Sequence, residues 1–170
     1  MRYISCVYCG YSFGTLRGWR VNMLYFDTPL TVRYVETDRM GIVHHSNYPV
    51  WFEVGRTEYI KNCGISYSNV EAKGIILPLL ELKCKFINSS NYEDKIVVRT
   101  RIKSYSKTRL NFYYEIFKEQ DMENPITIGE TAHVWTNTNL KPINLEKHFP
   151  ELYHIISTKK TYRINDQEEN

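Results

Sequence analysis

The chain has 170 residues, of which 42% are hydrophobic and 24% are charged, with a formal net charge of +3. These values are typical of one globular domain and exclude a disordered, collagen-like or disulfide-stapled chain. The positive surplus lies in residues 1–22, which contain three basic and no acidic residues. The remainder has no net charge and no apolar run long enough to span a bilayer. We therefore expect no nucleic-acid partner and no membrane span.

Residues 1–22 have no regular hydrophobic period and lack the apolar central run of a signal peptide. Codons for Trp19 and Arg20 can spell a bacterial ribosome-binding site shortly before the ATG of Met23. We therefore expect residues 1–22 to be a translated leader or disordered extension. Residues 23–157 are predicted to form the domain, followed by a polar tail over 158–170.

The four cysteines show no disulfide framework, which favours a reduced, cytoplasmic protein. Cys6 and Cys9 have the spacing of half a zinc site. Cys63 and Cys84 do not form a second pair, so a structural zinc is disfavoured. Both later cysteines fall on apolar faces and are interpreted as packing residues.

From residue 23 onward, hydrophobic periodicity predicts a strand, two helices, four further strands and a broken terminal helix. The first strand covers 29–36 and leads into a turn at 38–41. A long helix, which Ser46 or Asn47 can cap, then runs to Gly64. The remaining elements are expected at 66–73, 80–86, 96–103, 110–116, 126–134 and 144–156, the last interrupted at Pro150.

The long helix has one strong apolar stripe, on which Gly55 allows close approach of another backbone. The stripe consists of Tyr48, Trp51, Phe52, Gly55, Tyr59 and Cys63. One strand, a long helix and four antiparallel strands in that order predict an α+β fold with the helix on one sheet face.

The segment between the first strand and the long helix carries the candidate chemistry. Asp38, three residues before Gly41, is by itself typical of a turn. The helix that follows begins with unpaired, positively polarised N–H groups, so the same carboxylate would lie beside an oxyanion site. His44 and His45 do not indicate a metal site, because no third ligand is spaced nearby.

The run VRYVETDRMGIVHHSNYPVWFEVGRTEYIKNCG resembles the signature of the 4-hydroxybenzoyl-CoA thioesterase family of hotdog-fold enzymes. The resemblance rests on the Asp-x-x-Gly-Ile-Val turn, the Asn-Tyr helix start and Arg56-Thr-Glu58, and it covers residues 27–140. It implies a five-stranded antiparallel sheet wrapped around a long central helix. It also implies that two protomers pair their sheets edge to edge, with the active sites at that interface, in a dimer or a dimer of dimers.

Carried over residue by residue, the catalytic aspartate of the family falls on Asp38, and the backbone N–H that faces the thioester carbonyl falls on His45. At the position of His45 the hydroxybenzoyl enzymes carry tyrosine, whereas related short-chain members often carry histidine. The resemblance therefore implies hydrolysis of a short-chain, medium-chain or aryl acyl-CoA without a cofactor. The expected substrate-binding residues are Gly41, Ile42, Val43, Asn47, Tyr48 and Trp51.

Several alternatives stay open. Asp38 could activate water or attack the carbonyl, and Glu53 or Glu58 on the helix could be the catalytic carboxylate instead. A basic strand face could bind CoA phosphates, meet an acidic acyl-carrier protein, or simply be solvated; it comprises Arg101, Lys103, Lys107 and Arg109. Rival functions are an acyl-carrier-protein thioesterase and a non-catalytic acyl-CoA-binding module.

Overall fold

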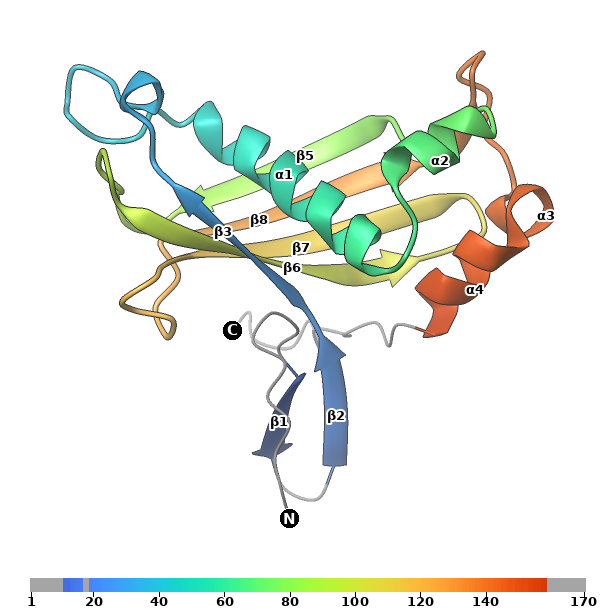
Figure 1. Cartoon of the computed structure of the whole chain (residues 1–170), viewed down its shortest axis with the longest axis horizontal. Coiled ribbons are helices and arrows are strands. Elements are labelled where there is room, and N and C mark those ends of the chain that lie inside the picture. Colours follow the sequence, from blue (N-terminus) through green and yellow to red (C-terminus); the bar gives the residue numbers. More distant parts are fainter. Residues whose placement is uncertain (1–10, 17–18, 159–170) are drawn as a thin grey trace, which may run out of the picture.

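The computed structural model describes residues 11–16 and 19–158, with only the backbone described up to residue 24. Five antiparallel strands form the main sheet in the order β3-β6-β7-β8-β5, and α1 (Asn47–Asn62) lies across one face of it (Figure 1). These strands are β3 (Phe26–Thr31), β5 (Leu79–Phe86), β6 (Lys95–Tyr105), β7 (Arg109–Lys118) and β8 (Thr127–Val134). The predicted α+β architecture is confirmed.

The core lies between α1 and the inner face of the sheet. Alternation in β6 and β7 buries one apolar set against the helix, including Val98, Phe112 and Tyr114, each fully buried. Phe52 of α1 stacks on Tyr114 with ring centroids 4.5 Å apart. Gly55 allows this close approach, since a Cβ there would lie 2.6 Å from Thr100 Oγ1.

The inner face of β8 is unexpectedly polar. Its buried side chains are Thr127, Thr131 and His133, while the apolar residues of the same strand lie half-buried on the other face. Gly129 completes the inner row, because any Cβ there would lie 2.2 Å from the Phe52 ring. A large aromatic ring on the helix thus requires a residue without a side chain on the strand.

The predicted strand over 29–36 is wrong in its second half. β3 ends at Thr31, and Tyr34–Glu36 form a 3-10 turn, η1, in which Tyr34 is 77% exposed. The turn forms because the Glu36 carboxylate accepts a hydrogen bond from the backbone N–H of Arg33 at 2.7 Å. This local bond replaces the ladder pairing that would have extended the strand.

The predicted helix ends are confirmed at their C-terminal side. Gly64 follows α1 with φ +89°, and Gly74 follows α2 (Tyr67–Ala72) with φ +70°, the left-handed backbone that favours glycine. The terminal helix is broken as expected into α3 (Leu145–His148) and α4 (Pro150–Thr158).

Two short pairings lie outside the main sheet. β4 (Ile75–Ile76) pairs with β9 (Thr136–Asn137). β1 (Tyr11–Leu16) and β2 (Trp19–Leu24) form a separate hairpin before β3 (Figure 1). The expected leader boundary at Met23 therefore falls within β2; whether residues 1–22 are natural stays a prediction. Cys6, Cys9 and most of the predicted tail over 158–170 lie outside the described residues.

Candidate active site

Asp38 begins the tight turn that the sequence predicts. Its carbonyl accepts a hydrogen bond from Gly41 N at 2.9 Å, and its Oδ1 accepts one from Met40 N at 2.8 Å. Gly41 has φ +76°, which a residue with a side chain rarely adopts. Asp38 N also donates to Ile42 O at 3.0 Å. The carboxylate is therefore held at a fixed place, with one of its oxygens engaged by the turn.

The start of α1 differs from the prediction in a way that bears on its chemistry. Ser46 is the residue before the helix, but its side chain caps no N–H and lies 2.8 Å from His44 Nδ1. The Asn47 side chain donates to the carbonyls of Glu36 and His44 instead of capping. Among the described residues, none accepts a hydrogen bond from the backbone N–H of His45. The N–H of His45, two residues before the first residue of α1, is thus available to an anionic group.

Asp38 and His45 line the same cavity. Its volume is about 380 Å³, and the remaining lining residues are Met40, Ile42, Val43, Tyr48, Phe86, Ile87, Asn88 and Ser89. The structure therefore brings together five of the predicted site residues. It does not place Gly41, Asn47 or Trp51 in the lining, so their contact with substrate stays a prediction.

Sequence reasoning missed the wall formed by residues 86–89. This wall begins with Phe86, the last residue of β5, and β5 lies at the opposite edge of the sheet from β3. It reaches the site because Val43 N donates to Ser90 O at 2.8 Å and Ile42 bridges to Asn91. No spacing in the sequence indicates which strand end would meet the Asp38 turn.

Sequence reasoning also missed Glu36, which lies close to the Asp38 turn. Its side chain is only 3% exposed, and it accepts hydrogen bonds from Arg33 and from Trp51 Nε1, the latter at 3.0 Å. Burial raises the pKa of Glu36, but the hydrogen bonds from Arg33 and Trp51 outweigh it, so that the pKa lies below its ordinary value. Trp51 is thereby held in the core.

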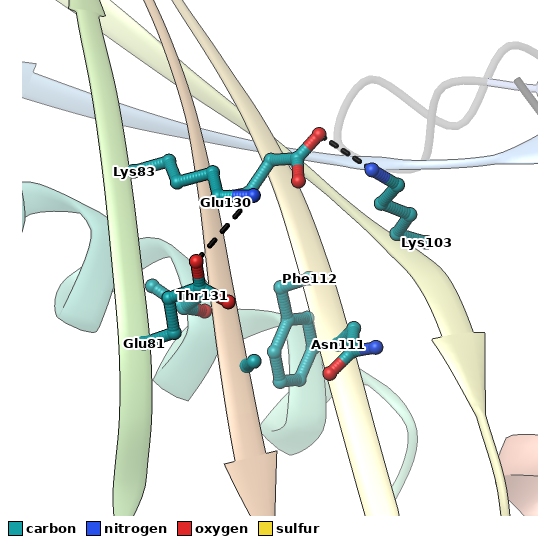
Figure 2. Close-up of a pocket in the computed structure, with 8 residues that line it drawn as sticks. Glu81, Lys83, Lys103, Asn111, Phe112, Glu130 and Thr131 are labelled. Atoms are coloured by element: carbon teal, nitrogen blue, oxygen red, sulfur yellow. Dashed lines mark hydrogen bonds and ion pairs between the residues drawn. The ribbon is translucent and has the colours of Figure 1, made fainter. Parts of the chain in front are cut away.

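Three of the four predicted CoA-binding cations form ion pairs within the chain. Arg101 pairs with Glu115, Lys103 Nζ lies 2.7 Å from Glu130, and Lys107 Nζ lies 2.6 Å from Glu146. Figure 2 shows the Lys103–Glu130 pair beside a cavity of about 100 Å³ whose lining includes Asn111 and Phe112. Arg109 is exposed and forms no ion pair with any described residue. CoA binding by these residues stays a prediction.

The rival carboxylates on α1 lie outside the cavity that contains Asp38. Glu58 pairs with Lys61 at 3.3 Å. Glu53 is exposed and lines a separate cavity of about 430 Å³ with Arg56 and Tyr67. Burial raises the pKa of the Cys84 thiol to about 11, which disfavours a thiolate nucleophile at that position.

A buried polar network joins α1 to the sheet. Arg56 Nη1 lies 3.0 Å from His133 Nε2, which lies 2.9 Å from Thr131 Oγ1. Tyr114 extends the network, with its hydroxyl 2.8 Å from Thr131 Oγ1. Burial first, and the Arg56 charge second, lower the pKa of His133 to about 4. The sequence gives no signal for this histidine, because its partner lies 77 residues away.

Over the described part of the chain, no three histidine, cysteine, aspartate or glutamate side chains gather as a metal site would require. The helices described are too short or too polar to cross a membrane.

The structure thus combines a long helix packed on a five-stranded antiparallel sheet with a cavity lined by Asp38 and His45. Residues 32–152 match the family model described as the thioesterase-like superfamily. The chain therefore belongs to the thioesterase-like superfamily, and the predicted hotdog fold is confirmed. The narrower resemblance to the 4-hydroxybenzoyl-CoA enzymes stays a prediction.

Particular relatives extend this assignment. YneP of Bacillus subtilis, for which an acyl-CoA thioesterase activity has been proposed, is 37% identical over 124 residues, covering 72% of this chain and 88% of YneP. The acyl-acyl carrier protein thioesterase ATL3 of Arabidopsis thaliana is 31% identical over 134 residues, covering 79% and 70% of the two chains. The structure of a DHNA-CoA thioesterase from Staphylococcus aureus is similar with a TM-score of 0.75 and 38% identity, covering 79% of this chain and 89% of that one.

Proposed function

We propose that the protein is an acyl-CoA thioesterase that hydrolyses a short-chain, medium-chain or aryl acyl-CoA to the free acid and CoA. The observation that carries the proposal is that Asp38 and His45 line one cavity just before the start of α1. The names of the relatives from Bacillus subtilis and Staphylococcus aureus support the same reaction class.

In the proposed reaction, the thioester carbonyl lies between the Asp38 carboxylate and the backbone N–H of His45. Asp38 acts as the base for water or as the nucleophile, and the N–H group stabilises the oxyanion that develops. The apolar wall of Met40, Phe86 and Ile87 accommodates the acyl group. So sparse a site suffices because a thiol, with a pKa near 8.5, leaves readily without strong acid assistance.

An acyl-carrier-protein thioesterase is the second candidate. The 31% identity to ATL3, named for acyl-acyl carrier protein hydrolysis, favours it specifically. In that case the acidic carrier would contact the exposed basic residues, of which Arg109 has no carboxylate partner among the described residues.

Thiol release, followed with a colorimetric thiol reagent over a panel of acyl-CoA and acyl-carrier-protein thioesters, tests the function and separates the two candidates. Asp38→Asn keeps the shape of the turn but removes the base or nucleophile. We expect it to lower turnover at least about a thousandfold, equivalent to about 4 kcal/mol, while substrate binding and thermal stability change little. Hydrolysis of carrier-protein thioesters alone would replace the first candidate with the second.

His45 variants test the oxyanion role. His45→Ala retains the backbone N–H and should be mild, whereas His45→Pro removes it and should cost about a hundredfold or more in turnover. Circular dichroism of the proline variant checks that the helix is intact. Wild-type turnover in Asp38→Asn together with loss in Glu58→Gln would move the catalytic carboxylate onto α1 and refute the assignment.

A further inference from the structure

Glu36 is a buried carboxylate next to the proposed site, but it does not line the cavity. Its side chain accepts three hydrogen bonds: Arg33 N at 2.7 Å, Arg33 Nη2 at 2.9 Å and Trp51 Nε1 at 3.0 Å. Arg33 precedes the Asp38 turn, and Trp51 lies in the second turn of α1. One carboxylate therefore joins the two segments from which the site is built.

The backbone carbonyl of Glu36 makes the same connection a second time. It accepts hydrogen bonds from His44 N at 2.9 Å and from Asn47 Nδ2 at 2.8 Å. His44 precedes the residue whose N–H is left free, and Asn47 is the first residue of α1. Of the five hydrogen bonds that Glu36 accepts, those from Trp51, His44 and Asn47 connect it to the start of the helix, and Asp38 is only two residues further along the chain.

Filling the space beside Trp51 does not by itself require a charged side chain. Burying a carboxylate costs free energy unless every lone pair is satisfied, and an apolar side chain could fill the same space beside Trp51. The three donors contact both side-chain oxygens of Glu36, so both positions must accept hydrogen bonds. Only a carboxylate supplies an acceptor at each of them. A glutamine would turn its NH2 group toward one of these donors. Neither the NH2 group nor that donor would then have an acceptor.

We propose that Glu36 is a positioning residue, which holds the Asp38 turn in register with the oxyanion donors at the start of α1. This inference rests on the proposed function, because the register matters only if Asp38 and His45 act on the same thioester. Glu36 touches no reacting atom and acts through Asp38 and the helix start. A displacement of about 1 Å between catalytic groups can cost about a hundredfold in rate.

Glu36→Gln tests the proposal, with Trp51→Phe as a graded variant that removes one of the three side-chain hydrogen bonds. We expect Glu36→Gln to lower kcat about 10- to 100-fold with KM within about threefold, and Trp51→Phe to have a smaller effect in the same direction. The matched control is Asp27→Asn, which also converts a carboxylate bound by arginine to an amide, on β3 away from the cavity. Its kcat should stay within about twofold of the wild type.

Hydrogen exchange of the backbone amides gives a readout that does not depend on activity. Glu36→Gln should speed exchange over residues 38–47 while exchange in β6 and β7 stays at the wild-type rate. An unchanged kcat in Glu36→Gln would overturn the positioning role. So would a fall in kcat that Asp27→Asn matches and that faster exchange throughout the sheet accompanies. A wild-type protein that releases no thiol from any thioester would refute the proposed function instead. Unchanged exchange over 38–47 in Glu36→Gln would separately refute the claim that Glu36 holds this segment.

Discussion

The buried imidazole of His133 should make the stability of the fold depend on pH above the range in which most carboxylates titrate. The ring is fully buried between β8 and α1, and its Nε2 faces Arg56 and Thr131. An arginine side chain can only donate, so Nε2 must accept, and the ring is neutral. Protonation would place a second positive charge against the guanidinium of Arg56.

The sign and size of the effect follow from the difference between the two states. Burial and the Arg56 charge lower the pKa of His133 to about 4 in the folded protein, whereas an exposed histidine has a pKa of about 6.5. Between these values the unfolded chain binds a proton that the folded chain does not. The free energy of unfolding therefore falls as the pH drops from about 6.5 to about 4, by up to about 3 kcal/mol, and is unaffected above that range.

Urea unfolding at fixed protein concentration between pH 4.5 and pH 8 measures this dependence. His133→Gln is the matched variant, because the glutamine Oε1 can accept from the same two donors but does not titrate. The stability advantage of the wild type over His133→Gln should shrink by about 2–3 kcal/mol from pH 7 to pH 4.5, with carboxylate contributions common to both proteins cancelling. Parallel stability curves for the two proteins over this range would refute the reasoning.

Two further predictions concern packing and assembly. Gly55→Ala should destabilise the protein by about 1–3 kcal/mol in thermal unfolding, despite the higher helix propensity of alanine. The reason is that the new Cβ would lie 2.6 Å from Thr100 Oγ1 and 2.8 Å from Val98 Cγ1. As a control, Thr57→Ala on the solvent side of α1 should change the stability by no more than about 0.5 kcal/mol. β5 lies at an open sheet edge, and its Leu80 and Phe86 are half-exposed. Light scattering should therefore report a dimer or larger assembly, which Leu80→Lys should weaken. A fully active monomer at micromolar concentration would contradict this prediction.

The parts of the molecule that sequence predicts well are those fixed by residues a few positions apart. The turn at Asp38 needs only its own side chain and a glycine three residues later. Gly64 ends α1 because a left-handed backbone is required there, and Pro150 begins the last helix. Alternation in β6 and β7 likewise predicts the core face, because both strands are covered by α1 on one side only.

The parts that sequence does not predict depend on partners far apart in the chain. Glu36 looks like one more strand residue until Trp51, fifteen positions later, is placed against it. The inner face of β8 is polar because the helix side chains opposite require it: Phe52 needs the space at Gly129, and Arg56 needs an acceptor at His133. Hydrophobic periodicity assigns apolar residues to a core, but it carries no information about the shape or charge of the opposing surface.

The basic run of residues 99–109 shows the same limit for electrostatics. Along one strand, this run predicts an anion-binding face, but β7 and β8 contribute the carboxylates of Glu115 and Glu130, which neutralise Arg101 and Lys103. A CoA phosphate would have to displace these half-buried carboxylates, and each cation would lose a partner as it gained one. Charge density along a sequence therefore indicates a binding surface only when the adjacent strands leave the charges unpaired.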